Sequence, residues 1–293
     1  MCDKTLLEGT TLSLDVRWTA SDQNMGYHFH KMRTISVLNM KGGVGKTTTA
    51  VHLAAGFSSR GLRVLLIDAD PQGNVGHMLD VRSKHTLREC LLGDISPTEA
   101  IVPRVRPNLD VIVLTTEAFS LERQLAGMTQ RETIMTRRFS GLDRYDLVFV
   151  DTSPAMNLLT FNALLFSSAV VIPVAMDLMA VIGARQTLNG IREVQELWPD
   201  RRLEVLAVLP TMVNHVTNAS RATLQAIAGD ARLGAHLYQP GIRQCLDLTY
   251  AAANHQTIWE YAPRSRAADD FTAFLDFVDS AITSDRSMVA HAH

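Results

Sequence analysis

The sequence contains little cysteine and little lysine. Three cysteines occur among its 293 residues, and they are odd in number, far apart and without a C-x-x-C spacing. This pattern argues against a disulfide framework, a zinc site or a pair of cluster ligands. Only five of the 28 basic residues are lysine, and two of these, Lys41 and Lys46, lie in one glycine-rich hexapeptide.

A strong excess of one charge and long apolar runs are also missing. The 28 basic and 30 acidic residues leave a formal net charge of −2, so any binding of nucleic acid must come from a local patch. No apolar run approaches the ~18 residues that a membrane-spanning helix needs. The start of the chain lacks a basic stretch followed by an apolar one. We therefore expect a cytoplasmic protein.

From Thr34 onward, short apolar runs rich in Val and Ile alternate with segments of helical period, which predicts a doubly wound α/β fold with a mostly parallel sheet flanked by helices. Several runs are continuously apolar, as in strands buried on both faces. The predicted strands are 34–38, 63–68, 109–114, 146–151, 169–174 and 203–209. The predicted helices are 47–59, 155–166, 181–197, 219–228 and 267–282.

The expected domain organisation is simple. We expect residues 34–284 to form a single α/β domain, residues 1–33 to form a poorly ordered N-terminal extension, and residues 285–293 to form a tail. The stretch from about residue 75 to 145 gives the weakest pattern, and no internal repeat or low-complexity linker is visible.

A glycine-rich loop follows the first predicted strand and precedes a helix. It reads Asn-Met-Lys-Gly-Gly-Val-Gly-Lys-Thr-Thr-Thr over residues 39–49. Glycines let backbone N–H groups turn toward phosphate oxygens, and the helix N-terminus favours an anion. Lys46 can then reach the β- and γ-phosphates, and the Thr47 hydroxyl can ligate magnesium. Met40 replaces the first glycine of the general P-loop pattern.

Two further strands end in acidic residues. Asp68 and Asp70 lie at the end of the second predicted strand, where carboxylates emerge at the ligand-binding edge of a parallel sheet. Asp151 ends a buried apolar strand and is suited to holding magnesium through its water shell. The three signals together predict a nucleotide site with ATP and Mg²⁺ as its ligands.

These motifs, KGGVGKTT, DADPQGN and the VDTSP strand end, resemble those of the deviant Walker A P-loop NTPases, and among them the ParA partition ATPases. The resemblance covers about Met32 to Phe274. It implies that Lys41 reaches the partner's nucleotide in an ATP-sandwich homodimer, that Asp70 positions the attacking water, and that Asp68 and Asp151 serve the magnesium. The residues that it assigns to the phosphates are Lys41, Gly42, Gly43, Val44, Gly45, Lys46, Thr47 and Thr48. Thr211 and Met212 would lie near the adenine.

The resemblance also implies a purpose. ParA dimers bind DNA without sequence preference, and a cargo-bound ParB-like or adaptor protein stimulates hydrolysis. The cargo would be a plasmid, a chromosome or a protein assembly such as a carboxysome or chemoreceptor cluster, and the protein would associate with the nucleoid. Residues 201–266 hold seven arginines against four acids. Arg243 matches a DNA-contacting position, and Arg221, Arg264 and Arg266 are further candidates.

Three alternatives stay open from the sequence. A MinD-like ATPase would dock on a membrane through its last helix, and residues 271–282 do show apolar residues at helical spacing, although the polar face is acidic where anionic lipid favours Lys and Arg. Nitrogenase iron proteins share the loop but need paired cluster cysteines, and Cys90 has no companion nearby. A regulator could bind nucleotide without hydrolysing it.

Overall fold

The computed structural model describes residues 32–116 and 120–290, with side chains given as far as residue 283. The expected N-terminal extension, residues 1–33, lies outside the described residues except for its last two.

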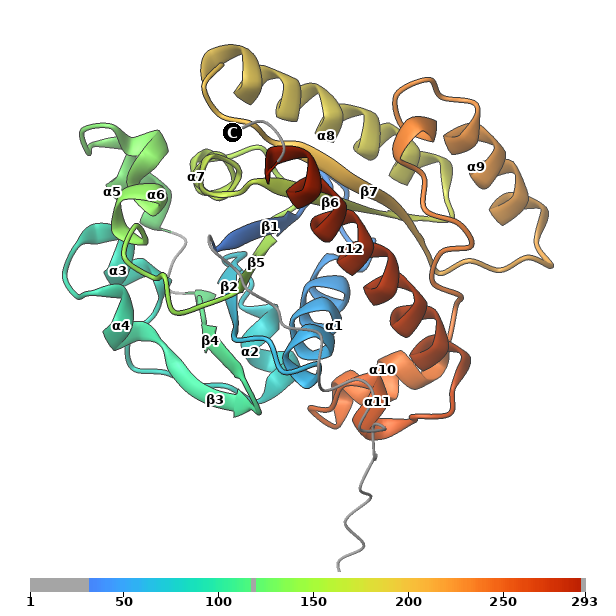
Figure 1. The fold of residues 1–293 in the computed structure, drawn as a ribbon, viewed down its shortest axis with the longest axis horizontal. Coiled ribbons are helices and arrows are strands. Elements are labelled where there is room, and N and C mark those ends of the chain that lie inside the picture. The colour runs from blue at the N-terminus through green and yellow to red at the C-terminus, as the bar shows by residue number, and fades with distance from the viewer. Residues whose placement is uncertain (1–31, 117–119, 291–293) are drawn as a thin grey trace, which may run out of the picture. The chain divides into compact units, whose positions relative to one another are not determined.

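The core is a seven-stranded sheet with the strand order β3-β4-β2-β5-β1-β6-β7 (Figure 1). All neighbouring strands are parallel except β3 and β4. The strands are β1 (Arg33–Val37), β2 (Val64–Ala69), β3 (Val102–Arg106), β4 (Leu109–Ile112), β5 (Leu147–Thr152), β6 (Ala169–Ala175) and β7 (Glu204–Thr211). The predicted doubly wound fold is confirmed, and each of the six predicted strands forms with its ends within two residues of expectation.

Helices cover both faces of this sheet (Figure 1). The longer ones are α1 (Lys46–Ser59), α7 (Leu158–Phe166), α8 (Leu178–Leu197), α9 (Asn218–Ala228), α10 (Leu246–Ala253) and α12 (Arg266–Ala290). The shorter ones are α2 (Asn74–Leu79), α3 (Leu87–Leu92), α4 (Pro97–Ala100), α5 (Leu121–Ala126), α6 (Ile134–Arg138) and α11 (Ile258–Tyr261), with 3-10 turns η3 (Arg131–Thr133) and η4 (Gly234–His236). Contacts place α1 and α12 together on one face, and α3 and α5 to α8 on the other.

The central strands are apolar on both faces because helices bury both faces. In β5, Phe149 stacks on Phe57 of α1 with ring centroids 5.9 Å apart. The alternate residues Val148 and Val150 belong to the core on the opposite face. The apolar run in the sequence is therefore continuous because this strand lies between two layers of helices.

Three features differ from the prediction. The edge strand β3, antiparallel to β4, was not predicted. The short helices between residues 74 and 138, and α10 and α11, were not predicted either. Helix α12 continues to Ala290, eight residues beyond the predicted end of the last helix at residue 282.

The apolar face of α12 packs on the core. Phe271, Phe274 and Val278 are fully or almost fully buried. Gly56 of α1 permits this approach, because a Cβ built there would lie 2.2 Å from Leu275 Cδ1. The apolar face that suggested a membrane-docking helix is thus occupied by the chain itself. None of the helices in the described ranges is long and apolar enough to cross a membrane.

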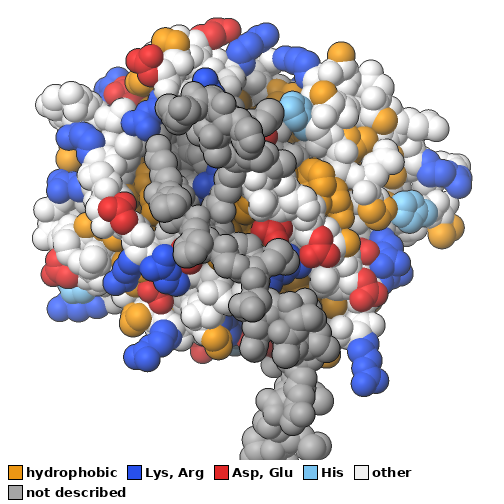
Figure 2. Space-filling view, in the orientation of Figure 1, with side chains coloured by type: hydrophobic (Ala, Val, Ile, Leu, Met, Phe, Trp, Pro, Cys, Tyr) orange, Lys and Arg blue, Asp and Glu red, His pale blue; other side chains and the backbone are white. Residues whose placement is uncertain are grey.

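Acidic and basic side chains are mixed over the face of the molecule that Figure 2 shows. This agrees with the near-neutral net charge of −2.

Candidate nucleotide site

The phosphate loop connects β1 to α1 at the carboxyl edge of the sheet. Gly43 and Gly45 have φ values of 75° and 84°, which lie in the left-handed region that glycine adopts without steric cost. Gly45 is also the N-cap of α1, and its carbonyl oxygen accepts the Thr49 N–H at 2.9 Å. The loop backbone therefore runs directly into a helix N-terminus, as the sequence predicts for an anion site.

Neighbouring elements hold the start of this loop. The Asn39 side chain donates to the Pro173 carbonyl oxygen at 2.7 Å and accepts the Lys41 N–H at 2.9 Å. The Met40 N–H donates to Thr187 Oγ1 of α8 at 2.9 Å. Gly183 of α8 lets the loop lie close, because a Cβ there would come within 2.8 Å of both Asn39 Oδ1 and Lys41 Cβ. The loop conformation is thus fixed by β6 and α8 before any ligand binds.

The two lysines of the loop have different environments. Lys46 is 7% exposed, and its Nζ donates to the Lys41 carbonyl oxygen at 3.1 Å. Burial lowers the pKa of Lys46, and the charges of Asp151 and Asp70 partly oppose this shift. Lys41 is only partly buried. Lys46 is therefore positioned inside the site, while Lys41 lies at its edge.

Three carboxylates meet at the ends of β2 and β5. Asp68 and Asp151 are direct neighbours in the parallel register of these strands, and both are fully buried. Asp68 accepts the backbone N–H groups of Asp70 and Val75, each at 3.1 Å, and so shapes the turn that carries Asp70. Burial raises the pKa of Asp68 well above its usual range, and the nearby charge of Asp151 adds to this effect.

These residues fit the magnesium ion that the motifs imply. The Thr47 hydroxyl donates to Asp151 Oδ2 at 2.6 Å, while Asp151 Oδ1 is buried and has no hydrogen-bond partner among the described residues. Burial raises the pKa of Asp151 as well. Oxygen ligands from a hydroxyl and a carboxylate suit Mg²⁺, and a cation there would offset the cost of the buried charge. Both carboxylate oxygens of Asp68 already accept backbone N–H groups.

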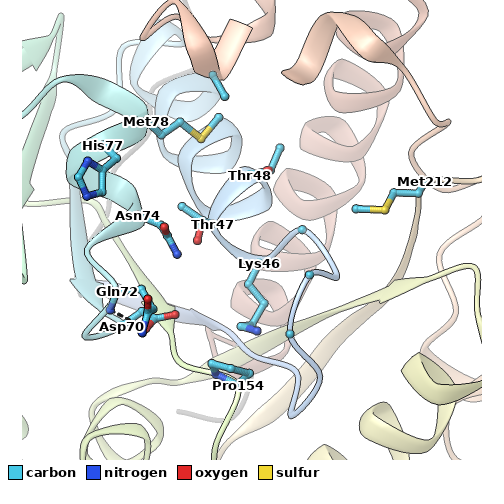
Figure 3. Close-up of a pocket in the computed structure, with 14 residues that line it drawn as sticks. Lys46, Thr47, Thr48, Asp70, Gln72, Asn74, His77, Met78, Pro154 and Met212 are labelled. Atoms are coloured by element: carbon cyan, nitrogen blue, oxygen red, sulfur yellow. Dashed lines mark hydrogen bonds between the residues drawn. The ribbon is translucent and has the colours of Figure 1, made fainter. Parts of the chain in front are cut away.

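A cavity of about 600 Å³ opens over the loop. In Figure 3, Lys46 and Asp70 approach it from opposite sides, and Thr47 and Thr48 project from the start of α1. The lining residues that the sequence predicted are Gly42, Gly43, Gly45, Lys46, Thr47, Thr48, Asp70 and Met212. The lining residues that sequence reasoning missed are Gln72, Asn74, His77, Met78, Pro154 and Ala252. Gln72 and Asn74 belong to the DADPQGN motif itself, and His77 and Met78 follow it on α2, so their closeness to Asp70 in sequence was an available signal.

The two residues predicted near the adenine divide into different roles. Met212 lines the cavity and is 45% exposed, with φ at 55°. Thr211 is buried, and its hydroxyl donates to the Val44 carbonyl oxygen at 2.9 Å. Thr211 therefore anchors the phosphate loop to β7. Val44 itself packs in the core, so only its backbone is available to a phosphate.

Known proteins are similar to this chain in sequence. A family model described as an AAA domain matches residues 32–205. The sporulation initiation inhibitor protein Soj of Bacillus subtilis is 36% identical over 243 residues, which cover 81% of this chain and 94% of Soj. The chromosome partitioning protein ParA of Caulobacter vibrioides is 31% identical over 269 residues, 89% of this chain and 98% of that protein. The chain belongs to the ParA family of partition ATPases.

Solved structures share the fold of this chain. The cobyrinic acid a,c-diamide synthase of Mycobacterium smegmatis with bound ATP analogue and magnesium superposes with a TM-score of 0.70 at 29% identity, over 84% of this chain and 93% of that chain. An ATP complex of McdA from Cyanothece gives a TM-score of 0.76 at 21% identity, over 86% of this chain and 97% of that chain, and this likeness concerns the fold alone. As a ParA-type protein the chain is an ATPase.

The arginines that the ParA resemblance assigned to DNA lie in different surroundings. Arg243 and Arg266 line one groove of about 430 Å³ beyond β7, whereas Arg221 is an exposed residue of α9 and Arg264 an exposed residue before α12. Arg243 pairs with Asp270 through its Nε and Nη2, at 3.0 and 2.7 Å. The Arg243 N–H also donates to that carboxylate at 2.8 Å, so this arginine has a structural role in the fold.

Proposed function

We propose that this ParA-type ATPase is a nucleotide-dependent switch that forms an ATP-sandwich homodimer, binds DNA without sequence preference and positions a cargo. The observation that supports the dimer is that the two lysines of the loop lie in different places relative to the cavity. Within the described part of the chain, Lys46 lines the cavity and Lys41 does not, although only four residues lie between them. A cation that stands at the edge of its own site is suited to reach the nucleotide of a second copy.

The chemistry follows from positioning and charge, because phosphoryl transfer needs little covalent help from the protein. Lys46 and the loop N–H groups would hold the phosphates of ATP. Magnesium, when bound, supplies further positive charge against the phosphate oxygens. Asp70, held by Asp68 and accepting the Gln72 N–H at 3.0 Å, is placed across the cavity from Lys46 (Figure 3) and would orient the attacking water.

DNA would bind through the exposed arginines near the groove, chiefly to phosphates, which gives affinity without sequence preference. Relatives named Soj and ParA act in sporulation control and chromosome partitioning. By analogy we propose a cytoplasmic, nucleoid-associated protein whose partner is a cargo-bound ParB-like or adaptor protein that stimulates hydrolysis. The occupied apolar face of α12 favours this function over a membrane-docking one.

Three variants test the switch. Lys46→Ala should lose nucleotide binding, because it removes the cation inside the cavity. Lys41→Ala should bind ATP but stay monomeric in analytical ultracentrifugation with ATP and magnesium. Asp70→Ala should dimerise and hydrolyse slowly. Lys84→Ala, outside the site, is the control for the loss of a lysine. Normal ATP-dependent dimerisation of Lys41→Ala would refute the cross-dimer role.

A salt series tests the DNA proposal. Filter binding of two unrelated duplexes, with ATP and magnesium, should give equal affinities that fall steeply as salt rises. Absence of binding at low salt, or a strong preference for one duplex, would remove nonspecific DNA from the function.

A further inference from the structure

Helix α10, which is far from the phosphate loop in the sequence, contributes to the lining of the nucleotide cavity. Ala252 of α10 lines that cavity together with His77 and Met78 of α2. We define the α10–α11 segment as residues 246–261. It begins just after Arg243 and ends just before Arg264 and Arg266. It therefore connects the wall of the nucleotide site to the arginines proposed for DNA.

His52 joins this segment to the helix of the phosphate loop. Its Nδ1 lies 2.7 Å from the carbonyl oxygen of Thr48, and its Nε2 accepts the N–H of Ile258 at 3.0 Å. Because Nε2 accepts, the hydrogen of the neutral ring is on Nδ1 and is donated to Thr48. The ring is fully buried and stacks on Phe271 of α12, with centroids 4.4 Å apart. Ile258 is the first residue of α11, so its N–H has no acceptor within the helix, and His52 supplies that acceptor.

His255 makes a second tie, to α2. Its Nδ1 donates to the carbonyl oxygen of His77 at 2.8 Å, and its φ of 56° is left-handed, which is uncommon for a residue with a Cβ. The His255 carbonyl oxygen in turn accepts Nη2 of Arg106 in β3 at 2.8 Å. Thr48 and His77 both line the nucleotide cavity (Figure 3), so each histidine bonds to the backbone of a residue that would contact the nucleotide.

We propose that His52 and His255 are positioning residues that tie the α10–α11 segment to two walls of the nucleotide cavity and so transmit nucleotide binding to the arginines on either side of it. The idea rests on the proposed function for its consequence at DNA, but its first step concerns the nucleotide and this segment alone. A ligand that orders Thr48 and His77 orders, through one hydrogen bond each, a segment that contacts it at Ala252. Coupling of this kind needs no movement of the sheet.

Hydrogen exchange measured by mass spectrometry tests the first step. Magnesium AMPPNP should slow exchange in residues 246–261 of the wild-type protein. His255→Gly keeps the left-handed backbone accessible and removes the tie, so its segment should lose this response while its AMPPNP affinity stays within about twofold. His255→Asn, which tolerates a positive φ and offers an amide donor, should restore the response. His236→Asn on η4 is the matched control for an exposed histidine.

His52→Gln provides a second variant, because its amide can still accept from Ile258 while its link to Thr48 is lost. It should also weaken the response of the segment. At DNA, either uncoupled variant should reduce the ratio of affinities with AMPPNP and with ADP by about threefold to tenfold, the effect of one lost hydrogen bond. The inference would be overturned if AMPPNP left the exchange of residues 246–261 unchanged in the wild-type protein, or if the variants showed the same change as the wild type. Wild-type protein that shows the response without binding DNA would refute the proposed DNA function instead.

Discussion

Acid should destabilise this protein through one histidine. His52 is fully buried and neutral in the folded state, where burial lowers its pKa from 6.5 to about 4. The hydrogen bond to the Thr48 carbonyl oxygen and the charge of Glu260 oppose this shift without cancelling it. Between these two pH values the unfolded chain binds a proton that the folded chain does not. The contribution of His52 to stability is therefore complete above pH 6.5 and is lost as the pH falls toward 4.

The size of the effect follows from linkage. A fall in pKa from 6.5 to about 4 corresponds to about 3 kcal/mol. Urea unfolding of wild type and His52→Asn at several pH values between 7.5 and 4 measures it. The buried acids Asp68 and Asp151, whose raised pKa values have the opposite effect on stability, are present in both proteins. The difference between the two proteins therefore isolates His52.

The free energy of unfolding of wild type, relative to that of His52→Asn, should decline by about 3 kcal/mol over this range. The slope should be close to about 1.4 kcal/mol per pH unit in the middle of it. A difference that is flat with pH would refute the buried neutral imidazole, and with it the hydrogen-bond assignment of both ring nitrogens. An NMR titration of the imidazole gives the folded pKa directly and serves as the independent check.

The remaining predictions concern the loop and the arginines. Gly183→Ala should weaken ATP binding by about tenfold or more, because its Cβ would displace Asn39 and Lys41 and misplacing a binding group by a fraction of an ångström is costly. Gly190→Ala on the same helix meets only the mobile end of Met156 and should bind ATP normally in the same calorimetric titration. Arg243→Ala should lower the free energy of unfolding by about 1–2 kcal/mol, because the buried Asp270 loses the guanidinium and keeps only the backbone N–H of residue 243. Arg264→Ala should leave urea unfolding unchanged and reduce the salt slope of DNA binding by about 1. Lys46→Arg should bind ATP far more weakly than wild type in a fluorescent-nucleotide assay, although it keeps the charge, because a planar guanidinium does not fit a buried position that a compact ammonium fills.

The parts of the fold that the sequence predicts are those with strong local patterns. The buried strands β2, β5 and β6 are apolar on both faces and cannot be mistaken for surface segments. Edge strand β3 was not predicted because it contains Pro103 and carries the exposed Arg104 and the partly exposed Arg106 in place of an apolar run. Helices α2 to α6 have four to six residues each, which is too few for a helical period to appear.

The same distinction applies to the site. Glycine and lysine spacing predicted the phosphate loop because its residues are consecutive in the sequence. Other contacts join residues that are far apart in the chain. These are the approach of Ala252 to the nucleotide cavity, the hydrogen bond of His52 with Ile258 and the ion pair of Arg243 with Asp270. No local pattern records such contacts. From the sequence alone, His52 is interpreted as an ordinary hydrogen-bonded residue of the core, because only the structure shows its partners.

The scarcity of lysine has a physical reason at this site. The chain meets most needs for positive charge with arginine, which forms the flat, forked contacts seen between Arg243 and Asp270 and between Arg63 and Asp146. Inside the phosphate loop the requirement differs, because Lys46 must fit between the carbonyl oxygen of Lys41 and the anion while it is almost fully buried. A single ammonium on a flexible stem meets that requirement with donors in several directions. Lysine therefore occurs where a positive charge must fit into a narrow buried site, and arginine occurs where two donors can bind one carboxylate.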